Sequence, residues 1–181
     1  MTPIQLDEIK VAGEIGRRID LTIRKNLLAL DTENAFLVPF RQRNLESGYI
    51  GLGKLIDATV RFASYTGDEK VLELKRRLVA EAIKTQEPDG YIGILVPVSR
   101  LWGVYDIHEM SYLVLGLTND YKFFREQASL DAAKKLAGFI MSRWSAEPHR
   151  IPGSGKRANM YGVTTGLDGA LLTLYEQTKE R

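Results

Sequence analysis

Five side chains offer the clearest binding chemistry in the sequence, and all of them fall within residues 89–108. They are Asp89, Tyr91, Trp102, Asp106 and His108. Aromatic rings stack on the C–H faces of sugars, while carboxylate and imidazole groups exchange hydrogen bonds with hydroxyls. The mixture predicts binding of a polyhydroxylated ligand. The alternative interpretation is that the aromatic residues only pin long loops against the rest of the protein.

His108 is expected in the first turn of a helix, where the positive end of the helix dipole favours a neutral imidazole. A neutral imidazole can both donate to and accept from a hydroxyl group. The other interpretation of this lone histidine is a packing role at the end of a helix. Asp106 and Glu109 are three residues apart and match a capping box, in which the two side chains bond each other's backbone amides. This pattern favours a structural role for Glu109.

The composition excludes several kinds of site. No cysteine occurs among the 181 residues, so disulfides, thiolate metal sites and a cysteine nucleophile are excluded within this chain. Only two histidines are present, so neither a metal site nor a cofactor is predicted. The formal charge of +2 is too small to attract nucleic acid or an anionic membrane. The basic run at residues 75–77 is interpreted as the solvated face of a helix.

Apolar residues recur at three- and four-residue spacing along most of the chain, which predicts helices. These helices must therefore position the five side chains. Six helices are predicted, over residues 6–30, 51–65, 68–83, 106–117 and 123–144 and from 165 onward. No run alternates polar and apolar residues as a half-buried strand would, although residues 91–98 could form a short extended stretch. The predicted fold class is all-α.

The connections between these helices alternate in length. The second and third helices are separated by a turn at residues 66–68, with Asp68 as the cap of the third, and the fourth and fifth by a short break at residues 118–121, so each pair is predicted to form an antiparallel hairpin. The other three connections are long and should emerge together at the opposite end, where long loops are usually functional. These loops also carry Phe36, Phe40, Arg41, Arg43, Glu46, Tyr49, Arg100, His149, Lys156, Arg157, Asn159 and Tyr161.

Three blocks of sequence follow one another in an informative order. A helical hairpin with its turn at residues 66–68 leads to a Gln-x-x-Asp-Gly-Tyr-Ile segment at 86–92. Trp102 then precedes a His-Glu-Met sequence at 108–110, and a Leu-x-x-Leu-Tyr-Glu-x-Thr block occupies 171–178. In this order the blocks resemble those of the β-L-arabinofuranosidase-like glycoside hydrolases, of the glycoside hydrolase family 127 type.

The resemblance runs from about Gly48 to Arg181 and implies an (α/α)6 barrel of six helical hairpins, of which this chain would hold the N-terminal half. It also implies that His108 contacts the sugar. The acid/base glutamate and zinc-held cysteine nucleophile of the family would lie further along the barrel, so this chain alone is not expected to complete the reaction. Relatives carry a sugar-contacting histidine where this chain has Thr164 or Thr165, a departure that bears on the identity of the sugar.

The sequence therefore predicts one α-hairpin unit over residues 1–181 that binds a carbohydrate at the end with the long loops. Two alternatives stay open, namely a non-catalytic scaffold that binds a protein, and a glycosidase of the same architecture that uses only carboxylates. The candidate carboxylates are Glu46, Glu87, Asp89 and Asp106. A half-barrel should expose an apolar flank, so self-association or a missing C-terminal half is expected. Without a signal peptide or bilayer-spanning stretch, a cytoplasmic location is expected.

Overall fold

The computed structural model describes residues 6–153 and 166–180, and within them every regular element is a helix. The α-helices are α1 (Gly13–Lys25), α2 (Val38–Gln42), α3 (Leu52–Thr66), α4 (Glu69–Lys84), α5 (Asp106–Phe124), α6 (Gln127–Ala146) and α8 (Leu167–Thr178). The shorter turns are η1 (Leu6–Glu8), η2 (Leu27–Ala29), η3 (Glu33–Leu37) and η4 (Pro97–Ser99), of which η3 is a π-helix and the others are 3-10 helices. The predicted all-α class is confirmed.

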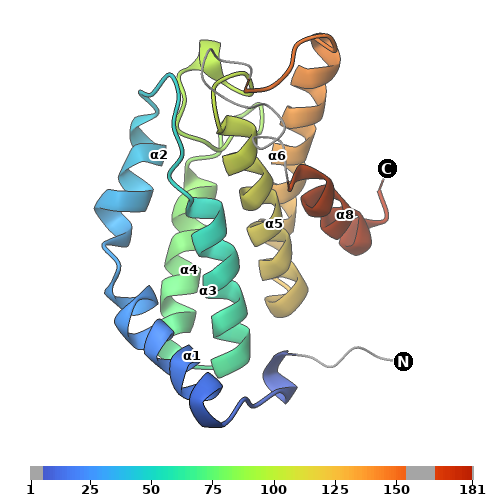
Figure 1. The fold of residues 1–181 in the computed structure, drawn as a ribbon. Coiled ribbons are helices and arrows are strands. Elements are labelled where there is room, and N and C mark those ends of the chain that lie inside the picture. Colours follow the sequence, from blue (N-terminus) through green and yellow to red (C-terminus); the bar gives the residue numbers. More distant parts are fainter. Residues whose placement is uncertain (1–5, 154–165, 181) are drawn as a thin grey trace.

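Two antiparallel hairpins form the centre of the fold, and local signals explain the first of them. Helix α3 ends at Gly67, whose φ of +64° is the left-handed conformation that glycine adopts most easily. Asp68 then caps α4, because its carboxylate accepts a hydrogen bond from the Lys70 amide at 2.8 Å. Helices α5 and α6 form the second hairpin, and α8 lies beside it (Figure 1). This arrangement matches the predicted hairpins of a partial barrel.

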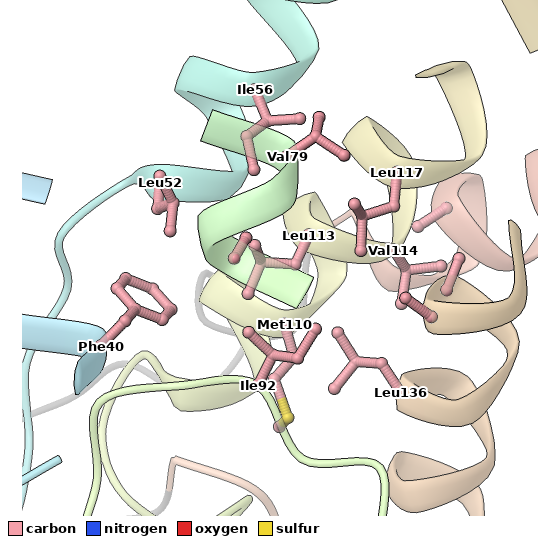
Figure 2. Close-up of a cluster of buried hydrophobic side chains, with 14 of the residues drawn as sticks. Phe40, Leu52, Ile56, Val79, Ile92, Met110, Leu113, Val114, Leu117 and Leu136 are labelled. Carbon is pink, nitrogen blue, oxygen red and sulfur yellow. The ribbon is translucent and has the colours of Figure 1, made fainter. Parts of the chain in front are cut away.

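Helices α3, α5 and α8 form an inner row, in which α5 contacts both of its neighbours, while α4 and α6 pack behind α3 and α5. Two glycines allow the close approach of α3 and α5. A Cβ atom at Gly53 would lie 2.4 Å from the backbone nitrogen of Leu113, and one at Gly116 would lie 3.0 Å from the Gly53 carbonyl oxygen. The buried side chains between the helices form one continuous core, part of which is shown in Figure 2.

Two predicted boundaries were wrong. The predicted break at residues 118–121 does not exist, because α5 continues through them to Phe124. The polar residues of this segment are buried and face neighbouring helices; Asn119, for example, donates to the Asp57 carboxylate at 2.7 Å. The observed first helix is also shorter than the predicted one, since α1 spans only Gly13–Lys25.

The basic run at residues 75–77 is solvated only in part. Arg76 and Arg77 are exposed, as predicted, but Lys75 is buried and its Nζ atom lies 2.8 Å from the Asp120 carboxylate. Ser129 donates to the other oxygen of the same carboxylate at 2.6 Å. This cluster connects α4, α5 and α6, so the interpretation of Lys75 as a surface residue was wrong. Within the described part of the chain, no helix has the length and apolar character that crossing a bilayer requires.

The described parts of the three long connections meet at one end of the molecule, opposite the short hairpin turns (Figure 1). Leu45 and Leu95 form an isolated parallel bridge, and the Gly48 amide donates to the Val104 carbonyl at 3.3 Å. The Gly153 amide donates to the Trp102 carbonyl at 3.2 Å.

The first long connection, predicted to be a loop, contains the short helices η3 and α2. Its Phe40 side chain is completely buried in the core (Figure 2). The loop residues Lys156, Arg157, Asn159 and Tyr161, and the candidate positions Thr164 and Thr165, lie outside the described residues.

Candidate functional site

His108 lies in the first turn of α5, at the end of the molecule where the long connections meet. Its ring is half-buried and surrounded by three tyrosine rings. The centroids of Tyr49 and Tyr112 are each 5.1 Å from that of the imidazole, and Tyr105 is at 6.4 Å. We call these four residues the aromatic cluster. It combines ring faces with hydroxyl and imidazole groups, which is the chemistry that sugar recognition requires.

Lys54 adds a positive charge beside this cluster. The residue is exposed, and its ammonium nitrogen lies 4.4 Å from the ring centroid of Tyr112 and 5.3 Å from that of Tyr49. Both distances fall within the range in which a cation is attracted to the face of an aromatic ring. Lys54 belongs to α3, so this helix as well as α5 contributes a side chain to the surroundings of the aromatic cluster.

Glu109 is completely buried and anchors the first long connection. Its Oε2 atom accepts hydrogen bonds from the amides of Ile50 at 3.0 Å and Gly51 at 2.7 Å, and its Oε1 atom accepts one from Gly53 at 3.2 Å. Gly51 is the N-cap of α3 and has no side chain to satisfy these donors, so a carboxylate from α5 does it instead. Burial raises the pKa of Glu109, and the hydrogen bonds from Gly51 and Gly53 oppose this shift.

Asp106 is also completely buried and anchors the second long connection. Its carboxylate accepts hydrogen bonds from the Leu101 amide at 2.7 Å and from the Tyr91 hydroxyl at 3.0 Å. The Tyr91 oxygen in turn accepts from the Leu95 amide at 3.0 Å, so the loop wraps around this phenol. Burial raises the pKa of Asp106 to about 7, and the hydrogen bond from Leu101 opposes this shift.

The predicted capping box between Asp106 and Glu109 was wrong. The residue that precedes α5 is Tyr105, with a left-handed φ of +68°, and Asp106 is already inside the helix. Each carboxylate turns toward a different long connection instead of toward its own helix end. The two residues are three positions apart in the first turn of α5, and His108 lies between them. The first turn of α5 therefore fixes the positions of the first and second long connections and of His108 relative to one another.

The five predicted site residues differ widely in exposure. His108 is half-buried, and Asp89 is exposed, with its carboxylate accepting a hydrogen bond from the Tyr91 amide at 3.1 Å. Trp102 is 5% exposed, and the guanidinium of Arg150 lies 4.4 Å from its ring centroid. Tyr91 and Asp106 contact each other and have no exposed surface, so in this arrangement they cannot touch a ligand directly.

Glu87 cross-links the same end of the molecule. Its carboxylate accepts two hydrogen bonds from Arg100, at 2.6 and 2.9 Å, and forms a further ion pair with Arg43. Arg100, followed by Arg43, lowers the pKa of Glu87. Among the four candidate carboxylates, Glu87 is thus engaged by two arginines and Asp106 is buried, while Glu46 and Asp89 are exposed.

The tyrosines of the aromatic cluster were not predicted as a group. Tyr105 and Tyr112 stand three residues before and four residues after His108, and this helical spacing could have indicated the contact. Tyr49 was noted only as one aromatic residue of the first long connection. No local pattern could have placed it against His108, because the contact depends on how α3 packs against α5.

An all-α array of hairpins, with aromatic and polar side chains gathered where its long connections meet, is an arrangement that can form a ligand site at that end. The family model described as "Beta-L-arabinofuranosidase, GH127 catalytic domain" matches residues 22–181. The chain belongs to this family. The match confirms the resemblance seen in the sequence blocks and extends it back into α1. No curated protein matches the chain.

Proposed function

We propose that the aromatic cluster binds one sugar residue of a carbohydrate, with His108 as its central hydrogen-bonding group. The observation that carries this proposal is the half-buried imidazole, ringed by three tyrosines with centroids at 5.1, 5.1 and 6.4 Å. Asp89 and Trp102 contribute from the second long connection. Tyr91 and Asp106 act indirectly, because they hold that connection in place from inside the protein.

The two buried carboxylates support this proposal because they make the site rigid. A sugar forms many weak contacts, so affinity depends on groups that are already in position before binding. Glu109 fixes the backbone beside Tyr49, and Asp106 fixes the backbone beside Trp102. Both carboxylates accept hydrogen bonds from backbone amides, so they fix the two long connections that flank the aromatic cluster.

The proposed role is recognition and not the complete reaction. The printed sequence contains no cysteine, so this chain alone has no thiolate with which to form a covalent glycosyl intermediate. We propose that residues 1–181 act as one unit, the N-terminal part of an (α/α)6 barrel, and that the groups that break the glycosidic bond come from outside this unit.

The proposal is tested by titrating the protein with L-arabinose, D-xylose and D-galactose, followed by thermal unfolding and calorimetry. A sugar at about ten times its dissociation constant stabilises the folded state by about 1.4 kcal/mol, which raises the melting temperature of a chain of this size by a few degrees. We expect L-arabinose to produce the largest shift. His108→Phe keeps an aromatic ring but removes both nitrogen atoms, so this variant should fold and lose the response.

One control variant and one refuting outcome make the result decisive. His108→Asn retains one donor and one acceptor and should recover part of the affinity that His108→Phe loses. If none of the three sugars changes the melting temperature or gives binding heat with the parent protein, the proposal is wrong.

A second candidate function, a helical scaffold that binds another protein, is favoured by an exposed apolar groove between α6 and α8. The groove has a volume of about 420 Å³ and includes Met141 and Leu172, which are 56% and 64% exposed. Under the first proposal this groove receives the next helical hairpin of the barrel. Under the second it receives a helix of a partner protein, and the sugars leave the melting temperature unchanged.

A further inference from the structure

Lys54 carries an inference about the chemical class of the carbohydrate, which rests on the function proposed above. We propose that the Lys54 ammonium binds an anionic substituent of the sugar, a carboxylate or a sulfate, so that the site favours an acidic sugar over its neutral counterpart. Lys54 lies in the first turn of α3, at the end of the molecule where the long connections meet (Figure 1). Its side chain is exposed, so a ligand can reach it.

The position of the ammonium is the first observation that supports this role. Its nitrogen lies 4.4 Å from the ring centroid of Tyr112 and 5.3 Å from that of Tyr49. Each of these centroids is in turn 5.1 Å from that of the His108 imidazole. The ammonium and the imidazole therefore adjoin the same two rings, and a sugar bound at His108 lies within reach of the ammonium. Attraction to the ring faces holds the ammonium there and leaves N–H donors for a ligand.

The ion pairs at this end of the molecule are the second observation. The described parts of the three long connections each place an arginine in an ion pair. Arg43 and Arg100 both pair with Glu87, and Arg150 pairs with the carboxylate three residues before it. Within residues 6–153 and 166–180, by contrast, the Lys54 ammonium forms no ion pair and no hydrogen bond. Its charge is thus available to a ligand.

The local structure gives this charge no other role. Glu109 is completely buried, and its two oxygens accept hydrogen bonds from the amides of Ile50, Gly51 and Gly53. A cation in the first turn of a helix is repelled by the positive end of the helix dipole, so the charge of Lys54 does not stabilise α3. An anionic ligand would provide the missing partner.

The chemistry of an ammonium group sets the expected selectivity. Its N–H groups can donate to the oxygens of a carboxylate or a sulfate, and a bond to a charged acceptor is about twice as strong as one to a neutral hydroxyl. Because Lys54 is exposed, water and salt screen the attraction. The preference for an acidic sugar is therefore modest at low salt and declines as the ionic strength rises.

The test compares D-galactose, D-galacturonate and D-galactose 6-sulfate by calorimetry in a buffer of low ionic strength. These sugars differ only at the sixth carbon, and D-galactose has the ring stereochemistry of L-arabinopyranose. We expect the parent to bind at least one acidic sugar about 2- to 10-fold more tightly than D-galactose. The preference should disappear in Lys54→Met, which keeps an apolar side chain, and persist in Lys54→Arg, which keeps the charge.

The matched control is Lys122→Met. Lys122 is also an exposed lysine beside an aromatic ring, with its ammonium nitrogen 5.9 Å from the ring centroid of Phe123. It lies in the last turn of α5, far along the helix from His108. This variant changes the net charge of the protein by the same amount as Lys54→Met, so it should keep the parent's preference.

The possible outcomes separate this inference from the function on which it rests. Equal affinity of the parent for D-galactose and both acidic sugars would overturn the role of Lys54 while the proposed function stands. A preference that survives in Lys54→Met, or that Lys122→Met also abolishes, would overturn it as well. Salt tests the same role without a substitution, because a preference that is unchanged at about 0.5 M NaCl would contradict it. If the parent binds none of the sugars, the proposed function fails and the role of Lys54 fails with it.

Discussion

Replacing Asp106 with alanine tests whether one buried carboxylate holds the second long connection. The carboxylate accepts from the Leu101 amide at 2.7 Å and from the Tyr91 hydroxyl at 3.0 Å, and it has no exposed surface. In Asp106→Ala both donors stay buried without an acceptor, at about 1–3 kcal/mol for each. We therefore expect the free energy of unfolding to fall by about 2–6 kcal/mol, a large part of the roughly 5–15 kcal/mol that stabilises a typical protein.

Asp106→Asn separates the charge from the shape of the side chain. Burial raises the pKa of Asp106 to about 7, well above the usual pKa of an exposed aspartate. The folded state then binds the proton more tightly than the unfolded state. The protonated carboxyl group of Asp106 therefore stabilises the folded state. This stabilisation is complete at a pH below the pKa of the unfolded state and is lost as the pH rises through about 7. At about 1.4 kcal/mol per pKa unit, the loss is on the order of 4 kcal/mol. The asparagine variant lacks this contribution.

The assay is guanidinium unfolding, followed by circular dichroism between pH 4 and pH 8. The difference in unfolding free energy between Asp106→Asn and the parent isolates the titration of this one group, because all other groups are shared. Glu69→Gln is a suitable control, since the exposed ion pair of Glu69 with Arg76 should contribute less than about 1 kcal/mol. The reasoning is refuted if Asp106→Ala unfolds at the same denaturant concentration as the parent, or if the asparagine variant keeps the parent's pH dependence.

Two further substitutions test the other buried charges. Glu109→Gln replaces the acceptor of three backbone amides, so we expect a loss of about 1–3 kcal/mol in denaturant unfolding and weaker binding of L-arabinose in calorimetry. A variant as stable as the parent would show that these bonds do not hold α3 in place. Lys75→Met leaves the Asp120 carboxylate buried without its cation and should cost about 3–5 kcal/mol, whereas the double variant with Asp120→Leu should recover most of this loss. Equal stability of the single and double variants would contradict this account.

The hairpin architecture could be predicted because its signals are local. Gly67 and Asp68 end one helix and begin the next through their own backbone angle and side chain, with no contribution from distant residues. The three- and four-residue spacing of apolar side chains likewise reports which face of a helix is buried. The ordered sequence blocks indicated the family, which the match over residues 22–181 confirms.

Three of the errors, at the break over residues 118–121, at Lys75 and at the capping box, have one cause: the sequence patterns placed polar residues at helix ends or on the surface. Asp120 lies inside α5 because Lys75 and Ser129 satisfy its carboxylate from two other helices. Glu109 resembled a cap for its own helix but caps α3 instead. In each case the partner is far away in the sequence, so a reading of neighbouring residues could not find it.

The sequence by itself determined the all-α class, the hairpin turns and the supply of aromatic, imidazole and carboxylate groups near the long connections. Only the tertiary structure decided which of these groups lie in the aromatic cluster and which are internal supports. Tyr91 and Asp106 were predicted contacts, yet they are sealed inside, while Tyr49 comes from another connection to lie beside His108. The physical reason is that helix periodicity encodes contacts three or four residues apart. The packing of α3 against α5 through Gly53 sets the contacts between distant segments.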